Sequence, residues 1–228
     1  MTGVKTPSAS GSATGKDARR SPLHLGLRAA FVPLVRRLWL KEVEGAEHLP
    51  RRGPAIIAAN HQSLLDFAVF EAALPRPPIF LVNKRFYARH VLAWCFDRMF
   101  FVPVDQEDAG RGGAAIREAA GVLAAGEHLA IFPEGGLSPD GDLQKAYEGI
   151  GLLAHLSEAP VIPVALRGTH EAWPKGTVLP RPRPCAVCFG EPLAFTRAQY
   201  RADRAIIAQS TRRIMRAVGD LAGKEYRW

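Results

Sequence analysis

The sequence predicts an α/β fold in which a central sheet is layered with helices. Short apolar runs that are typical of buried strands alternate along the chain with longer segments of helical character, and this alternation is the pattern of layered α/β domains. With 228 residues and 24.8 kDa, the chain suffices for one well-cored domain and is too short for two of ordinary size. Apolar residues make up 47% and charged residues 23% of the chain, which is the balance of a globular protein.

The first 21 residues are predicted to be a disordered tail. Residues 1–21 are rich in Ser, Thr and Gly and show no hydrophobic periodicity, which is typical of segments that cannot bury a core. They also lack the apolar stretch of a secretion signal, and three cysteines do not make a disulfide framework. We therefore expect a reducing, cytosolic environment.

Residues 22–41 are predicted to form an amphipathic helix with two apolar sides. One side is a stripe at spacings of three and four, made of Leu23, Leu27, Ala30, Leu34 and Leu38. The opposite side carries Leu25, Val32 and Trp39, flanked by Arg28 and Arg36. We expect one side to touch the protein body and the side with the two arginines to dock on a membrane surface.

The remaining residues, 42–228, are predicted to form the main domain. Buried strands are expected at six apolar runs, residues 55–59, 79–82, 100–104, 129–132, 161–166 and 186–189. Helices are expected between and after them, at about residues 64–73, 86–98, 112–125, 145–156 and 197–220. Because the catalytic groups of such folds gather at the carboxyl ends of the strands, polar residues at those points are the candidates for a site.

Two candidate catalytic residues follow the first buried strand. His61 and Asp66 are five residues apart, and on a regular helix they would lie about 140° apart. They can meet if His61 lies in the turn before the helix and Asp66 in its first turns. A carboxylate that holds one imidazole N–H fixes the tautomer and leaves the other nitrogen free to take a proton. No Gly-x-Ser-x-Gly elbow occurs in the sequence, so this base would act on a substrate hydroxyl directly.

A second candidate segment follows a later strand and reads Phe132-Pro-Glu-Gly-Gly-Leu-Ser138. The adjacent glycines Gly135 and Gly136 allow the backbone to approach a ligand and to present its N–H groups to an anion. A carboxylate beside an anion is unfavourable, so Glu134 is expected to hold the loop, or to contact a hydroxyl or amine, rather than a phosphate. Further along, Val161-Ile-Pro-Val164 belongs to another strand.

Together these motifs resemble those of the 1-acylglycerol-3-phosphate acyltransferase family of glycerolipid acyltransferases, over about residues 50–192. The family signature is Asn-His, four residues and Asp, then Phe-Pro-Glu-Gly, then Val-Ile-Pro-Val, in this order. The resemblance implies a mixed, mainly parallel sheet flanked by helices, with His61 as the general base and Asp66 as its orienting partner. It also implies a set of substrate-binding residues in the motifs: Asn60, Phe132, Pro133, Glu134, Gly135, Gly136 and Ser138.

Two departures from the family pattern bear on the acceptor. Gln106 and Leu137 stand where the family usually has arginines that are associated with the phosphate of the acceptor. Arginine binds a terminal phosphate well because its guanidinium forms two parallel hydrogen bonds with it. These changes therefore weaken the prediction that lysophosphatidic acid is the acceptor, unless Lys84 and Arg111 bind the phosphate instead. The run from Phe132 to Gly149 is similar to the acyltransferase domain of 2-acylglycerophosphoethanolamine acyltransferases.

The net charge of +8 is concentrated at the two ends of the chain. Residues 16–41 hold seven basic residues and one acid, and residues 197–228 hold eight basic and three acidic residues. The stretch between them, residues 42–196, has 14 basic and 18 acidic residues. A nucleic-acid binder usually carries its basic residues on the working face of the domain, so we expect an anionic membrane surface as a partner and no nucleic acid.

The resemblance implies an O-acyltransferase of phospholipid biosynthesis, bound peripherally at the cytoplasmic face of the cell membrane. It would move a fatty acyl group from acyl-CoA or acyl carrier protein to the free hydroxyl of a lysophospholipid. Neither a cofactor nor a metal is expected, and Cys185 and Cys188 are assigned to packing because no second pair is nearby. Two alternatives stay open: an acceptor such as lysophosphatidylethanolamine or a lyso-ornithine lipid, and an inactive membrane-surface binding protein on the same scaffold.

Overall fold

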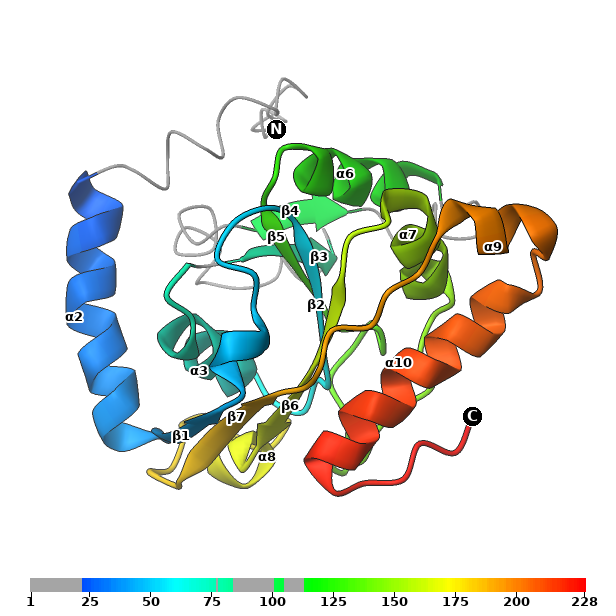
Figure 1. The fold of residues 1–228 in the computed structure, drawn as a ribbon. Coiled ribbons are helices and arrows are strands. Elements are labelled where there is room, and N and C mark those ends of the chain that lie inside the picture. The colour runs from blue at the N-terminus through cyan, green and yellow to red at the C-terminus, as the bar shows by residue number, and fades with distance from the viewer. Residues whose placement is uncertain (1–21, 77, 84–100, 105–112) are drawn as a thin grey trace, which may run out of the picture.

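A seven-stranded sheet forms the centre of the molecule (Figure 1). The computed structural model describes residues 22–76, 78–83, 101–104 and 113–228. The strands are β1 (Leu40–Glu44), β2 (Ala55–Ala59), β3 (Ile79–Asn83), β4 (Phe101–Val104), β5 (His128–Ile131), β6 (Val161–Arg167) and β7 (Cys185–Phe189). Their order across the sheet is β1-β7-β6-β2-β5-β3-β4.

Five neighbouring strands of this sheet run in the same direction. β2 pairs in parallel with both β5 and β6, and β3 pairs in parallel with β5 and β4. β7 is antiparallel to β6, and β1 is parallel to β7. The prediction of a mixed, mainly parallel sheet is therefore confirmed. All five residues of β2 are buried, which explains why its sequence is a continuous apolar run rather than an alternating one.

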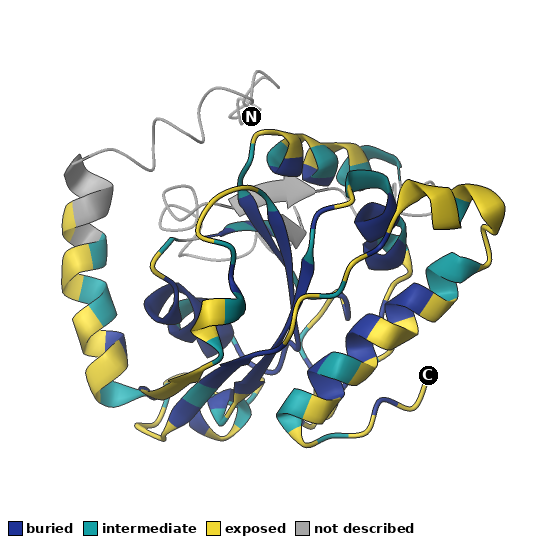
Figure 2. Cartoon of the chain, viewed as in Figure 1, coloured by how far each residue is buried: buried dark blue, intermediate teal, exposed yellow. Residues whose placement is uncertain are grey.

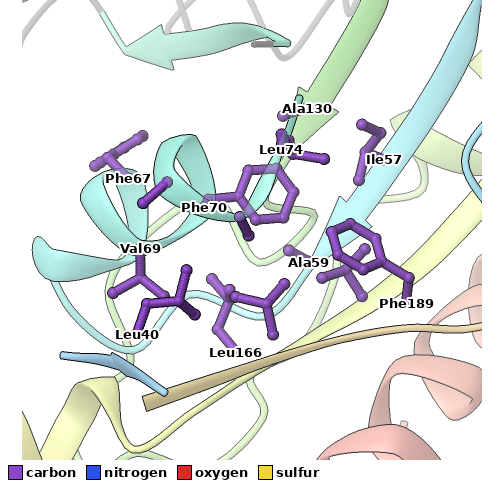
Figure 3. Close-up of a cluster of buried hydrophobic side chains, with 14 of the residues drawn as sticks. Leu40, Ile57, Ala59, Phe67, Val69, Phe70, Leu74, Ala130, Leu166 and Phe189 are labelled. Carbon is purple, nitrogen blue, oxygen red and sulfur yellow. The ribbon is translucent and has the colours of Figure 1, made fainter. Parts of the chain in front are cut away.

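Helices cover both faces of the sheet (Figures 1 and 2). They are α2 (Pro22–Leu38), the short 3₁₀ helix η1 (Ala46–His48), α3 (Leu65–Ala73), α6 (Gly113–Ala124), α7 (Gly149–Ser157), α8 (Thr169–Ala172), α9 (Arg197–Ala202) and α10 (Ile206–Ala222). One core lies between α3 and the sheet, where Phe70 packs with Leu166 and Phe189 (Figure 3). A second core lies on the opposite face, where Leu153 of α7 and Ile214 of α10 pack on Ile56 of β2.

Helices α7 and α10 approach one another unusually closely. A Cβ at Gly151 of α7 would lie 2.5 Å from the carbonyl oxygen of Ile207 and 2.6 Å from Oγ1 of Thr211, both in α10. Only a residue without a side chain fits between these atoms. On the same pair of helices, the buried His155 bonds Oγ of Ser210 through Nε2 at 2.9 Å and the carbonyl of Thr196 through Nδ1 at 2.8 Å. These contacts fix α10 and the start of α9 against α7.

Most predicted elements are present, and the short helices η1 and α8 were not predicted. Three further differences have a structural explanation or shift a boundary. Strand β1 was not predicted because four of its five residues are exposed and three of them are charged, as is common in a strand at the edge of a sheet. The predicted helix at 197–220 is instead two helices, separated at Asp203, whose carboxylate accepts the N–H of Ala205 at 2.8 Å. The helix predicted from residue 145 begins at Gly149. The predicted tail at 1–21 and the predicted helix at 86–98 lie outside the described residues.

Helix α2 docks on the protein with the side that was expected to face a membrane. Val35 is 1% exposed, and Val32 and Trp39 pack against the same core as α3. Leu34 and Ala30, from the stripe expected to touch the body, are exposed instead. This orientation corrects the predicted arrangement of the helix. The predicted division between residues 41 and 42 falls within strand β1, which continues from α2 after one residue.

The two arginines of this side bind groups of the protein body. Nη2 of Arg28 donates to the carbonyl of Leu74 at 2.6 Å, and its Nε lies 3.0 Å from Oε1 of Glu71. Nε and Nη2 of Arg36 both donate to the carbonyl of Ala72, at 3.1 and 3.0 Å. The two side chains therefore satisfy backbone carbonyls at the C-terminal end of α3, where the helix dipole favours positive charge. Among the helices in the described part of the chain, none is long and apolar enough to cross a bilayer.

Candidate active site

His61 and Asp66 form a hydrogen-bonded pair at the carboxyl end of β2. His61 lies in the segment between β2 and α3, and Asp66 lies in the first turn of α3. The distance between Nδ1 of His61 and Oδ2 of Asp66 is 2.9 Å. The same carboxylate oxygen accepts the backbone N–H groups of Gln62 at 2.7 Å and Ser63 at 2.9 Å. The predicted arrangement, with the histidine before the helix and the aspartate in its first turn, is present in the structure.

The pairing leaves one ring nitrogen of His61 available. Asp66 is completely buried, and an ionised carboxylate can only accept hydrogen bonds. Nδ1 therefore carries the proton, and Nε2 presents its lone pair. The side chain of His61 is 10% exposed, and within the described residues no group hydrogen-bonds its Nε2. The arrangement is that of a general base held by a buried carboxylate.

Two phenylalanine rings contact the imidazole of His61, and a third packs against both of them. The ring of Phe132 stacks on it with a centroid distance of 4.0 Å and an interplanar angle of 12°. Phe67 meets the imidazole edge-on at 5.4 Å and 78°, and it contacts Phe80 in the same manner at 5.2 Å. These contacts fix the plane of the imidazole, which the hydrogen bond to Asp66 alone would leave free to tilt. Phe132 was predicted to bind substrate, whereas Phe67 and Phe80 carry no motif and were not predicted.

Glu134 connects three segments of the site through backbone N–H groups. Its Oε1 accepts the N–H of His61 at 3.1 Å, and its Oε2 accepts the N–H of Gln144 at 2.9 Å. Burial raises the pKa of the Glu134 carboxyl to about 8, against the effect of these two donors. The expectation that Glu134 holds the loop agrees with these contacts. Gln144 contributes only its backbone, so no side-chain pattern in the sequence could have singled it out.

Ser138 fastens the loop after Glu134 to the segment that carries His61. The backbone N–H of Ser138 donates to the carbonyl of His61 at 2.8 Å, and its hydroxyl donates to Oδ1 of Asp140 at 3.0 Å and accepts the N–H of Gly141 at 2.9 Å. Ser138 is fully buried, so its contacts favour a positioning role. Pro133 is also buried and accepts the N–H of Tyr147 at 2.8 Å.

The two glycines of the loop are exposed beside the site. Gly135 has a φ of +71°, a conformation that favours glycine, and its N–H donates to the carbonyl of Phe132 at 3.0 Å. A Cβ on Gly136 would meet no atom within 4 Å. Open space therefore borders Gly136, which agrees with the expectation that a ligand approaches the backbone here.

Asn60 holds the start of the segment between β2 and α3 against the neighbouring strand β6. Its Nδ2 donates to the carbonyl of Leu166 at 3.0 Å, and its Oδ1 accepts the N–H of the same residue at 2.7 Å. The side chain is completely buried. The amide continues the pairing of β2 and β6 beyond the last strand residue, so these contacts favour positioning of His61 over the predicted substrate contact.

The predicted phosphate-binding cations are not part of the described structure. Lys84 and Arg111 lie outside the described residues, as does Gln106. Leu137 is partly buried in the loop after Glu134. Cys185 and Cys188 are buried in β7 without a disulfide, and burial raises the pKa of their thiols to about 12 and about 11. Within the described part of the chain, no group of His, Cys, Asp or Glu residues is arranged to hold a metal ion.

The model of the family described as Acyltransferase matches residues 41–167, more than half of the chain. The chain belongs to the acyltransferase family. The matched segment contains the pair of His61 and Asp66, Glu134 and strands β2 to β6. The family membership predicted from the three motifs is confirmed. The similarity to 2-acylglycerophosphoethanolamine acyltransferases stays a prediction.

Curated relatives agree with this membership. The acyltransferase chain is 31% identical over 153 residues to the 1-acyl-sn-glycerol-3-phosphate acyltransferase of Limnanthes alba, covering 67% of this chain and 54% of the relative. It is 27% identical to the chloroplastic enzyme of that name, LPAT1, from Arabidopsis thaliana, covering 66% and 45%. The chain thus spans about half the length of the curated relatives it matches.

A solved structure supports the fold. The crystal structure of the 1-acyl-sn-glycerophosphate acyltransferase PlsC from Thermotoga maritima superposes with a TM-score of 0.65, covering 93% of this chain and 88% of the other at 22% identity. The glycerolipid acyltransferase-like fold that the resemblance implied is therefore confirmed.

Proposed function

We propose that this acyltransferase moves a fatty acyl group from a thioester donor to the free hydroxyl of a lysophospholipid. The observation that carries the proposal is the His61–Asp66 pair, 2.9 Å apart, with Nε2 of the imidazole free of hydrogen bonds to the described residues. A base of this kind suits the deprotonation of a hydroxyl. The names of the curated relatives support an acceptor of the 1-acyl-sn-glycerol-3-phosphate type.

The reaction follows from the position of the base. Nε2 of His61 takes the proton of the acceptor hydroxyl as that oxygen attacks the carbonyl carbon of the thioester. Asp66 stabilises the imidazolium through its hydrogen bond to Nδ1. When the carbon–sulfur bond breaks, the imidazolium returns the proton to the departing thiolate. The products are the new ester and a free thiol, which would belong to coenzyme A or to acyl carrier protein.

The head group of the acceptor lysophospholipid is a separate and more specific proposal. Leu137 replaces a family arginine in the loop beside His61, and this replacement favours a second candidate acceptor without a bare monoester phosphate, such as lysophosphatidylethanolamine or a lyso-ornithine lipid. The intact pair of His61 and Asp66 argues against an inactive binding protein. Because the acceptor is a lipid, we also propose that the protein works peripherally at the cytoplasmic face of the cell membrane.

Acyl transfer by the purified chain tests this function. The assay offers radiolabelled acyl-CoA and acyl-loaded carrier protein to a panel of lysophospholipids and a lyso-ornithine lipid. We expect radiolabel in the diacyl product for wild type and at least a hundredfold slower transfer for His61→Ala. Absence of transfer to every acceptor from both donors, with a folded protein, would contradict the proposed function.

A further inference from the structure

The loop between α8 and β7, residues 173–184, projects two apolar side chains into solvent. Val178 is 86% exposed and Leu179 is 76% exposed, the highest values among the large apolar residues of the described structure. The two residues are adjacent, so together they form an apolar tip. Adjacent exposed apolar side chains of this kind mark contact surfaces rather than packing.

Basic residues flank this tip on both sides. Lys175 precedes it, and Arg181 and Arg183 follow it. All three are exposed, and residues 173–184 include no acid. An apolar tip between cationic side chains matches the boundary of an anionic bilayer, where acyl chains lie directly beneath phosphate groups.

The loop is held in one conformation by bonds within itself. Nε1 of Trp173 donates to the carbonyl of Thr177 at 3.0 Å, and the hydroxyl of Thr177 donates to the carbonyl of Pro174 at 2.9 Å. The N–H of Arg181 donates to the carbonyl of Ala172 at 2.7 Å. Four prolines, residues 174, 180, 182 and 184, restrict the backbone further. Val178 and Leu179 are therefore presented to solvent without further ordering of the loop.

The loop lies at the same edge of the sheet as the catalytic pair. It follows the carboxyl end of β6, the strand beside β2. The carbonyl of Trp173 accepts a hydrogen bond from the hydroxyl of Ser63, two residues from His61, at 2.8 Å. At its other end, the carbonyl of Arg181 accepts a hydrogen bond from Nε1 of Trp39, the residue that follows α2, at 2.8 Å.

We propose that residues 173–184 dock the enzyme on an anionic bilayer. Val178 and Leu179 insert among the acyl chains, and Lys175, Arg181 and Arg183 contact lipid phosphates. Docking by this loop brings the edge that carries His61 to the surface where a lysophospholipid resides. The choice of a lipid partner rests on the proposed function. The loop takes the place of the arginine-flanked side of α2 as the proposed membrane contact, because that side of α2 is packed on the protein body.

Vesicle binding by charge-introducing variants tests the loop. The variant Val178→Asp/Leu179→Asp is compared with wild type for co-sedimentation with vesicles of phosphatidylglycerol and phosphatidylcholine. The matched control, Ala198→Asp/Ala202→Asp, adds the same two charges at exposed positions of α9. We expect at least a tenfold weaker partition for the loop variant and wild-type partition for the control. The variant Lys175→Gln/Arg181→Gln/Arg183→Gln should lose affinity for these vesicles and lose little for pure phosphatidylcholine vesicles.

Acyl transfer to two forms of the acceptor separates docking from catalysis. The loop variant should keep turnover with a short-chain lysophospholipid that is monomeric in water, and lose it with a long-chain acceptor embedded in vesicles. Wild-type vesicle binding by the loop variant would overturn the proposal. Loss of turnover with the monomeric acceptor would also overturn it, because the loop would then be assigned to supporting His61. A wild type that elutes as a dimer on gel filtration and a loop variant that elutes as a monomer would likewise overturn it, because the loop would then contact a second copy of the chain. If wild type transfers no acyl group but the variant still loses vesicle binding, the proposed function fails and the docking surface stands.

Discussion

The side-chain carboxyl of Glu134 accepts the backbone N–H of His61 over 3.1 Å, so the acidic residue of the Phe-Pro-Glu-Gly motif positions the segment after β2 through its main chain. The other oxygen of the same carboxylate holds the N–H of Gln144. One buried side chain thus fixes the loop after β5 against the segment after β2. Both oxygens of Glu134 are therefore engaged by backbone N–H groups of the protein.

The stability of the protein should fall as the pH rises because of Glu134. Its pKa is raised from 4.5 to about 8 by burial, so between these values the folded state binds a proton that the unfolded state has released. This contribution is fully present below the unfolded pKa and is lost as the pH rises through the folded one. We expect the free energy of unfolding to fall by roughly a few kcal/mol between about pH 5 and pH 8.5.

Denaturant unfolding of Glu134→Gln across the same pH range measures this contribution. The amide retains one acceptor and cannot titrate, so the variant should show a flatter pH dependence and a lower stability at acidic pH by about 1 kcal/mol. Equal slopes for the variant and the wild type would show that Glu134 does not change its protonation on unfolding.

Removal of the base or its partner should abolish most of the activity. We expect His61→Ala to slow acyl transfer by about 10² to 10⁴. For the partner, Asp66→Asn is a better test than alanine, because Asp66 also accepts two backbone N–H groups and alanine would leave these unpaired. The asparagine variant should lose a similar factor, since it no longer stabilises the imidazolium. Circular dichroism checks that both variants are folded; near-wild-type rates in folded His61→Ala would exclude the mechanism.

Asn60 should contribute to stability as well as to rate. Replacement by alanine leaves the N–H and the carbonyl of Leu166 without their partners in a fully buried setting. We expect Asn60→Ala to lower the free energy of unfolding by about 2–4 kcal/mol, and to reduce kcat more than it raises KM, because His61 is displaced. A raised KM with unchanged kcat and stability would instead support the predicted contact with substrate.

The C-terminal half of α2 should be held to the body by Arg36. Two of its nitrogens donate to the carbonyl of Ala72, and Arg36→Ala should therefore lower the free energy of unfolding by about 1–2 kcal/mol. The control is Arg37→Ala at the neighbouring exposed position, where a change within about 0.5 kcal/mol is expected. Thermal unfolding of the two variants measures this contribution. Equal melting temperatures would mean that the docking of α2 on the body does not depend on the contact of Arg36 with Ala72.

The acceptor preference should respond to Leu137. With leucine beside the site, competition between lysophosphatidic acid and lysophosphatidylethanolamine should reveal only a weak preference. Leu137→Arg should shift selectivity about tenfold toward lysophosphatidic acid, because a guanidinium can bind its monoester phosphate in a bidentate manner. A strong preference of the wild type for lysophosphatidic acid would indicate that other cationic side chains already bind its phosphate.

Local patterns in the sequence predicted six of the strands and the pair of His61 and Asp66. The run Ala55–Ala59 forms the buried strand β2 because an apolar segment of that length has few other ways to leave water. His61 and Asp66 meet because they are close in sequence and the start of a helix brings them together. Their chemistry could therefore be stated before any tertiary contact was known.

Contacts between distant segments were decided by the tertiary structure alone. The sequence showed that α2 has two apolar sides, but the carbonyls that bind Arg28 and Arg36 belong to the end of α3, and only its position selects the buried side. Strand β1 is charged and short, and it forms because β7, more than 140 residues away, offers a free edge for pairing (Leu40 with Cys185). The donors to Glu134 are backbone groups, which every residue carries and no sequence pattern can distinguish. Periodicity and motifs thus determined the elements and the reactive residues, whereas the partner of each face and of each buried polar group was determined by long-range packing.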